Sequence, residues 1–265
     1  MKSAIFPKLA AVSNHCAFQQ HQQRHCSFNT QLLEEMGEAL GDEALYQKVG
    51  IILGPACNIK RSPICGRNFE YFSEDPLLST VYTGALVKGI QSRGVGSCIK
   101  HFACNNQENR RLTVSADVEE RPLHEIYLAS FEGAVRDARP CSIMCSYNSI
   151  NGIHSYENEE LLQKILRNDW GFYGIVMSDW GAVNDRVNGL MTGLDLEMPG
   201  PAKLNHENVV DAVKNGILDD KYLDICVERV LDVMNRIMNG RKDGNYDLEA
   251  HHQIAKKLEK NVLFF

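Results

Sequence analysis

Asp179 and Trp180 follow a short apolar run, Ile-Val-Met at residues 175–177. Such a run is typical of a fully buried strand, so the Asp179 carboxylate stands at a strand end. Burying an acid is costly unless it is compensated, and in parallel barrels reactive groups gather where strands end and loops begin. An acid beside an aromatic ring also suits a sugar, which has one apolar face and a fringe of hydroxyls. On these residues alone, a helix-capping role for Asp179 is an equal alternative.

Other polar side chains follow other apolar runs. Lys100 and His101 close one of them, where a lysine has to be paired or exposed. Arg67 lies in a loop too long for a simple connector, and its guanidinium offers a planar fork of donors for paired hydroxyls or a carboxylate. Glu70 is expected to be a structural partner of Arg67 or of a backbone amide. Tyr147 follows a third run, where a phenol usually seeks a hydrogen bond. The plainer interpretations are a solvated strand end for the Lys-His pair and core packing for the tyrosine.

Strand-like and helix-like segments alternate along the chain. Apolar runs predict strands at 49–53, 95–99, 142–145, 174–178 and 194–197. Helical spacing and capping residues predict helices at 30–48, from 76, at 119–137, 158–168, 205–215 and 220–238, and from 248. This order indicates an α/β fold with a parallel sheet covered by helices. No glycine-rich nucleotide fingerprint follows a strand, and the polar residues follow several separate strands, so a closed barrel is favoured over an open sheet.

Composition narrows the class of protein. The chain has 265 residues, 44% of them hydrophobic and 23% charged, which is ordinary for a globular protein. A net charge of −6 argues against nucleic acid as a partner, and no run of eighteen apolar residues predicts a membrane span. Nine cysteines, several of them in or beside predicted strands, fit free buried thiols in a reducing compartment, so a cytoplasmic location is expected.

The N-terminal stretch carries a possible metal motif. His21 and His25 are four residues apart and are flanked by Cys16 and Cys26, a set that zinc would accept. No second pair at conventional spacing accompanies them, and the stretch is rich in glutamine. We therefore expect residues 1–29 to be an irregular or poorly ordered N-terminal segment without a metal.

Several longer motifs resemble the glycoside hydrolases of family 3. They are Gly-Arg-Asn-Phe-Glu-Tyr-Phe-Ser-Glu-Asp-Pro at 66–76, Lys-His-Phe at 100–102 followed by Asn-Asn-Gln-Glu at 105–108, Met-Cys-Ser-Tyr-Asn at 144–148, Ser-Asp-Trp at 178–180, and Asp-Leu-Glu-Met-Pro-Gly at 195–200. Several motifs in one order are far more specific than any one of them. The resemblance covers the chain from about Thr30 to the C-terminus, and its Asp-Trp pair and 195–200 segment look like the β-glucosidase branch.

The resemblance implies a TIM-like (β/α)8 barrel that carries a sugar pocket. Asp179 would be the nucleophile of a retaining β-glucosidase, which forms a covalent glycosyl-Asp intermediate while cleaving terminal β-D-glucosyl residues. Residues implied to bind the substrate are Arg67, Lys100, His101, Met144, Tyr147 and Trp180. The substrate would be a small β-glucoside, and the chemistry requires neither a metal nor an organic cofactor.

Two departures from the family pattern qualify this. The Asp-Gly segment that begins the family's barrel is missing before Thr30, so the barrel is expected to be incomplete at its N-terminus. We expect it to span 30–240, followed by a tail or linker at 241–265. The family's general acid/base is a Glu on a later domain, so an isolated barrel should be impaired, although Glu108 or Glu197 could substitute. The alternative function is an incomplete sugar-binding barrel, or one that needs a second domain or chain for its acid.

Overall fold

The computed structural model describes residues 8–10, 28–200, 202–242 and 244–262. The candidate zinc residues Cys16, His21, His25 and Cys26 lie outside them. Within this range no helix is long and apolar enough to cross a membrane.

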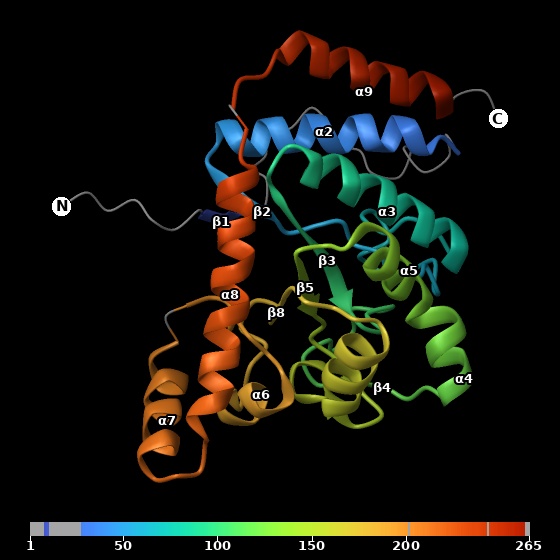
Figure 1. Cartoon of the computed structure of the whole chain (residues 1–265). Helices are drawn as coiled ribbons and strands as arrows, with labels where there is room; N and C mark the ends of the chain where they lie inside the picture. The colour runs from blue at the N-terminus through green and yellow to red at the C-terminus, as the bar shows by residue number, and fades with distance from the viewer. Residues whose placement is uncertain (1–7, 11–27, 201, 243, 263–265) are drawn as a thin grey trace.

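A five-stranded parallel sheet forms the centre of the molecule (Figure 1). Its strand order is β1 (Lys8–Ala10), β2 (Val49–Ile52), β3 (Gly96–Phe102), β5 (Ser142–Cys145) and β8 (Ile175–Met177). The predicted α/β class with a parallel sheet is confirmed, and the strands do not close into a ring among the described residues. A smaller sheet joins β4 (Ser115–Ala116), β6 (Ser149–Ile150) and β7 (Ile153–His154).

Helices separate the strands along the chain. They are α2 (Thr30–Tyr46), α3 (Pro76–Ser92), α4 (Glu120–Pro122), the π-helical turn η2 (Leu123–Tyr127), α5 (Ala129–Ala138), the short 3-10 turn η3 (Ser155–Glu157), the π-helical segment η4 (Glu160–Asp169), α6 (Arg186–Thr192), α7 (Lys203–Lys214), α8 (Asp220–Gly240) and α9 (Leu248–Val262). Caps fix two of the starts as predicted: Asp75 accepts a hydrogen bond from the Leu78 amide at the start of α3, and Asn158 accepts one from the Leu161 amide at the start of η4.

The alternation of side chains in the strands sorts the core into two layers. Residues of one parity, such as Ile99, Ile143 and Val176, pack with helices α2, α3, α5 and η4. Residues of the other parity pack on the opposite face against Val233 and Ile237, the two buried residues of α8. The alternation continues past β8, so it places Asp179 on the α8 side of the sheet.

Some predicted elements differ from the observed ones. The predicted strand at 194–197 is a single parallel bridge between Leu196 and Met177. Strand β3 extends to Phe102, so Lys100 and His101 lie within it rather than after it. Part of the N-terminal segment expected to be irregular, Lys8–Ala10, is strand β1. These elements depend on long-range pairing, which short stretches of sequence do not encode.

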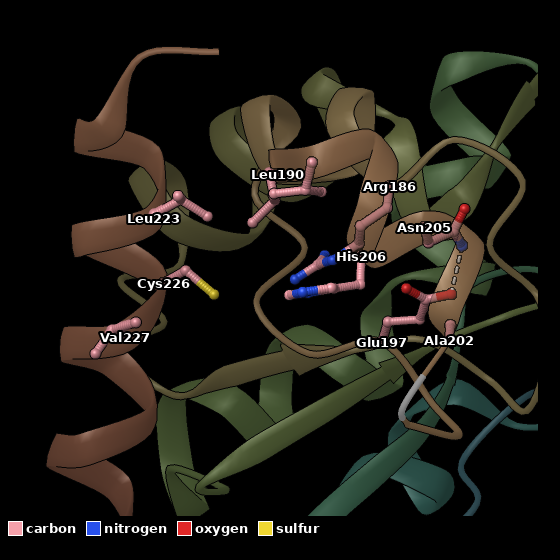
Figure 2. Close-up of a pocket in the computed structure, with 10 residues that line it drawn as sticks. Arg186, Leu190, Glu197, Ala202, Asn205, His206, Leu223, Cys226 and Val227 are labelled. Carbon is pink, nitrogen blue, oxygen red and sulfur yellow. Dashed lines mark hydrogen bonds between the residues drawn. The ribbon is translucent and has the colours of Figure 1, made fainter. Parts of the chain in front are cut away.

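A pocket lies among α6, α7 and α8, separate from the strand ends that carry the predicted site residues (Figure 2). Arg186, Glu197, Asn205 and Cys226 are among its polar lining residues, and Leu190, Val209 and Leu223 are among the apolar ones. The Glu197 carboxylate is engaged within this pocket, where it accepts a hydrogen bond of 2.6 Å from the Asn205 side chain.

Candidate active site

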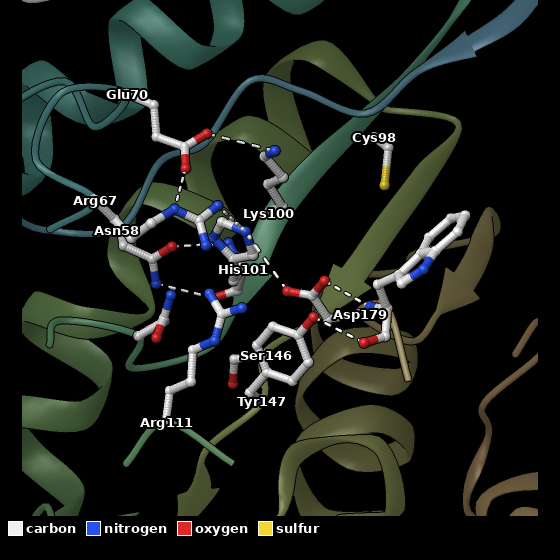
Figure 3. Close-up of polar contacts among 12 residues, drawn as sticks. Asn58, Arg67, Glu70, Cys98, Lys100, His101, Arg111, Ser146, Tyr147 and Asp179 are labelled. Carbon is white, nitrogen blue, oxygen red and sulfur yellow. Dashed lines mark hydrogen bonds and ion pairs between the residues drawn. The ribbon is translucent and has the colours of Figure 1, made fainter. Parts of the chain in front are cut away.

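The carboxylate of Asp179 is the centre of a polar cluster at the strand ends (Figure 3). Its Oδ1 accepts a hydrogen bond of 2.7 Å from the Trp180 amide. Its Oδ2 is buried, and no hydrogen-bond donor within the described residues reaches it. Burial raises the pKa of Asp179, and the Trp180 amide, the Tyr147 hydroxyl and nearby cations only partly offset this.

His101 lies beside Asp179, with its Nε2 3.7 Å from Asp179 Oδ2. Burial, reinforced by the charges of Lys100 and Arg67, holds the pKa of His101 well below its ordinary value, so the ring is neutral. Arg67 Nη2 lies 2.8 Å from the same Nε2. Because a guanidinium only donates, Nε2 is the acceptor of this bond and the ring proton is on Nδ1.

Glu70 organises the two cations of the cluster. Its carboxylate forms a short ion pair with Arg67 Nε, and Oε2 lies 3.4 Å from Lys100 Nζ. The predicted role of Glu70 as a partner of Arg67 is confirmed, and its bridge to Lys100 is an addition. Burial alone would lower the pKa of Arg67, but the attractions of Glu70, Tyr71 and Glu108 together outweigh it, and the pKa of Arg67 is raised. Glu70 thus holds Arg67 and Lys100 side by side near Asp179.

The aromatic and apolar residues predicted for the pocket occupy different places. The Tyr147 hydroxyl donates to the Trp180 carbonyl at 2.8 Å, and burial, with the Asp179 charge, raises its pKa to about 12. Met144 is buried in β5 and lies in register between Lys100 and Met177, beneath the polar cluster. Trp180 is 59% exposed, so core packing does not explain it.

Two residues that the sequence analysis did not select belong to this cluster. The Arg111 guanidinium lies over the Tyr147 ring, 4.4 Å from its centroid, and pairs with Glu108 at 2.7 Å. Asn58 is buried, and its amide group accepts from the His101 N–H and donates to the His101 carbonyl, at 2.7 and 2.8 Å. Arg111 offered the same signal as Arg67, a guanidinium in a long loop after a strand, whereas Asn58 shares the loop of Arg67 but carries no charge that would have singled it out.

The other carboxylates considered as the general acid are engaged elsewhere. Glu108 pairs with Arg111, approaches Arg67 at 3.8 Å, and accepts from the Asn105 side chain. Glu197 lines the pocket among α6, α7 and α8. We assign neither of them as the acid.

The described residues contain neither a cluster of metal ligands nor a reactive thiol beside Asp179. No three His, Cys, Asp or Glu side chains gather there as a metal site would require. The cysteines described are free, and all but Cys226 are buried. Burial raises the pKa of Cys98 to about 12, so this thiol close to the cluster is protonated and unreactive.

This arrangement, an ionisable acid flanked by cations and a neutral imidazole at the ends of parallel strands, is typical of an enzyme active site. A family model described as "Glycosyl hydrolase family 3 N terminal domain" matches residues 6–233. The chain therefore belongs to glycosyl hydrolase family 3, and the match begins well before Thr30, where the sequence resemblance was placed.

Individual relatives agree with this assignment. Thermostable β-glucosidase B from Acetivibrio thermocellus is 53% identical over 88% of this chain and 31% of its own length. An exo-α-(1→6)-L-arabinopyranosidase from Bifidobacterium longum is 47% identical over 86% of this chain and 30% of its own length. The structure of β-glucosidase 3B from Thermotoga neapolitana in complex with glucose has a TM-score of 0.89 at 44% identity, covering 92% of this chain and 36% of that one. The chain thus spans about a third of the length of these relatives.

Proposed function

We propose that this chain forms the sugar pocket of a retaining β-glycosidase of the β-glucosidase type, with Asp179 as its nucleophile. The observation that carries the proposal is the state of Asp179: Oδ1 is fixed by a backbone amide, while Oδ2 is left without a donor from the described residues, beside a neutral histidine. An oxygen held in place but not consumed by a hydrogen bond is the one that can attack an anomeric carbon.

In the first step, Oδ2 of Asp179 forms a bond to the anomeric carbon while the bond from that carbon to the leaving oxygen breaks. The electron pair leaves with that oxygen. In the second step, a water oxygen forms a bond to the anomeric carbon while the bond to Asp179 Oδ2 breaks, and the electron pair of that bond restores the carboxylate. The water proton passes to the group that protonated the leaving oxygen, or to solvent where no such group took part. Attack requires the ionised form of Asp179, and the charges of Lys100 and Arg67 favour that form against the effect of burial.

The cations and the imidazole would hold the sugar hydroxyls during these steps. Arg67 and Lys100 are anchored by Glu70, and His101 is anchored through its backbone by Asn58. Anchored donors keep one geometry between the ground state and the transition state, which favours the reaction over mere binding. Arg111, stacked on Tyr147, would add a further donor on the same side.

We further propose that protonation of the leaving group depends on a carboxyl group from another domain or chain, since Glu108 and Glu197 are engaged. General acid catalysis typically contributes 10²- to 10⁴-fold to such rates. The isolated chain should therefore cleave glycosides with poor leaving groups slowly, and react with those whose leaving group needs no proton.

The test uses 2,4-dinitrophenyl 2-deoxy-2-fluoro-β-D-glucoside, whose dinitrophenolate departs unprotonated. We expect the chain to gain one fluoroglucosyl group, found by peptide mass spectrometry on Asp179, and Asp179→Ala to gain none. The corresponding arabinopyranoside reagent tests the sugar preference suggested by the second relative. Glucose binding without any adduct on the folded chain would contradict the nucleophile and favour the alternative, a sugar-binding barrel without turnover.

A further inference from the structure

A second buried carboxylate, Asp195, lies behind the strand that leads to the site. Its side chain is 1% exposed. Oδ2 accepts hydrogen bonds from the Val176 amide at 2.7 Å and from Arg167 Nη2 at 2.6 Å, and Oδ1 accepts one from Arg229 Nη1 at 2.9 Å. The reaction proposed above makes no use of this group.

The arginines around Asp195 come from separate parts of the chain. Arg167 belongs to η4, Arg229 to α8, and Arg186 to α6, where its guanidinium donates to the carbonyls of Leu194 and Asp195, both at 2.8 Å. We call Asp195 with these three arginines the Asp195 clasp. Buried ionic groups are a poor source of stability, because desolvation offsets their attraction, so geometric specificity is the better explanation for such a cluster.

The clasp is joined directly to the segment that carries Asp179. The Val176 carbonyl accepts from the amides of Asp195 and Leu196, at 2.9 and 3.0 Å, while its amide donates to the Asp195 carboxylate. Past the end of β8, the Ser178 amide donates to the Leu196 carbonyl at 2.9 Å. Residues 176–178 are thus hydrogen-bonded to the segment at 195–196, and Asp179 follows directly after them.

Strand β8 is only three residues long, so its own pairing with β5 gives limited control of the residues beyond its end. Displacing a reacting group by about 1 Å can cost on the order of 100-fold in rate. The hydrogen bonds that fix residues 176–178 therefore bear directly on the rate at which Asp179 attacks.

We propose that Asp195 is a positioning residue that sets the place of Asp179 Oδ2 through β8, with Arg167 and Arg229 fixing its carboxylate. The proposal rests on the assignment of Asp179 as nucleophile. It predicts that loosening the clasp slows the attack on the anomeric carbon while leaving ground-state binding of the sugar unchanged.

The experiment measures inactivation by the 2-fluoroglucoside, separating the inactivation rate constant from the dissociation constant of the reagent. In Asp195→Asn, which retains the shape of the side chain, we expect the rate constant to fall about 10- to 100-fold with the dissociation constant unchanged. Hydrogen exchange of the amides at 176–181 should become faster in the same variant. The control is Asp232→Asn on α8, which removes an exposed ion pair with Arg236 and should leave both constants as they are.

Arg229 provides a milder perturbation if Asp195→Asn does not fold, because its side chain is partly exposed. Arg229→Met should lower the rate constant several-fold, and Arg229→Lys should restore most of it. A normal rate constant in the folded variants, or a loss explained by weaker reagent binding, would overturn the positioning role. If the wild-type chain itself formed no adduct, the nucleophile assignment would be at fault, and the exchange at 176–181 would still report whether the clasp holds β8.

Discussion

At the scale of single residues, the site is defined by charges that are balanced before any sugar arrives. Arg67 and Lys100 share Glu70, Arg111 pairs with Glu108, and His101 is neutral. Arg67 and Lys100 together carry one positive charge more than Glu70 neutralises, and this charge attracts Asp179 without a direct ion pair. Among the described residues, the only basic side chain close to an Asp179 oxygen is His101, which is uncharged. A carboxylate in that state is reactive and also costs stability.

Because burying the ionised Asp179 carboxylate destabilises the folded chain, Asp179→Asn should raise the free energy of unfolding by an amount that depends on pH. Burial raises the pKa of Asp179, so the ionised carboxylate is less stable in the folded chain than in the unfolded one. This penalty is fully present above the folded-state pKa and disappears below the unfolded-state pKa of about 3.9. Asp179→Asn should therefore have a higher free energy of unfolding than the wild type at pH 7, and the difference should shrink toward pH 4. Urea unfolding across that range measures it, and a difference independent of pH would contradict the burial of an ionised acid.

Glu70→Gln tests the anchoring of the cations. The amide keeps the size of the side chain but removes the charge that holds Arg67 and Lys100. We expect the dissociation constant for glucose, measured by calorimetry, to rise about tenfold, which corresponds to about 1.4 kcal/mol.

The control for this variant is Glu160→Gln, which breaks an exposed pair with Lys164 on η4. Exposed pairs of this kind contribute little to stability, and breaking this one should leave glucose binding unaffected. Equal glucose affinity in the wild type and Glu70→Gln would show that the cations do not need Glu70.

At the scale of elements, the close crossing of α2 and α3 holds the layer that covers the sheet. A side chain at Gly89 would lie 2.2 Å from the Glu34 carbonyl oxygen and 2.9 Å from the Gly37 Cα. Both contacts are with backbone atoms, which cannot rotate away as a side chain could, so only glycine permits the two helices to approach this closely.

Gly89→Ala should lower the free energy of unfolding by about 1–3 kcal/mol, the usual cost of overpacking. Gly84→Ala is the matched control on the same helix, because a Cβ there meets nothing within 4 Å. Alanine is the better helix former, so this control should be neutral or more stable by up to about 1 kcal/mol. Chemical denaturation measures the free energy of unfolding of both variants. Equal changes in the two would show that α2 and α3 can move apart to accept a methyl group at position 89 without a loss of stability.

At the scale of the whole molecule, α9 returns to the N-terminal part of the described chain and packs on α2 (Figure 1). His251 Nδ1 lies 2.9 Å from Glu43 Oε1, and both side chains are buried. The Tyr246 ring stacks on His251 at 5.0 Å between ring centroids. A buried polar pair of this kind joins two ends of the described chain that are far apart in sequence.

His251→Ala should lower the free energy of unfolding by about 1–3 kcal/mol, because it leaves the Glu43 carboxylate buried without this partner. The neighbouring residue supplies the control: His252 is exposed, and His252→Ala should change stability by less than about 0.5 kcal/mol. Thermal unfolding compares the two, and a similar shift in both variants would show that the buried pair does not fasten α9.

Local patterns in the amino-acid sequence were enough to predict the parallel sheet and most of its strands and covering helices, though not β1. The same patterns were enough to nominate Asp179, Arg67, Lys100, His101 and Tyr147 as candidate site residues. Those patterns are apolar runs, caps, and polar residues where a run ends. The folded arrangement was needed to reveal that Arg111 stacks on Tyr147, that Glu70 bridges two cations and that Asn58 holds the His101 backbone. Such contacts join segments that are distant in sequence, and the local periodicity of apolar residues carries no information about which segments meet. The Asp195 clasp belongs with them, because its carboxylate meets Arg167, Arg229 and the Val176 amide only when η4, α8 and β8 come together in the folded chain.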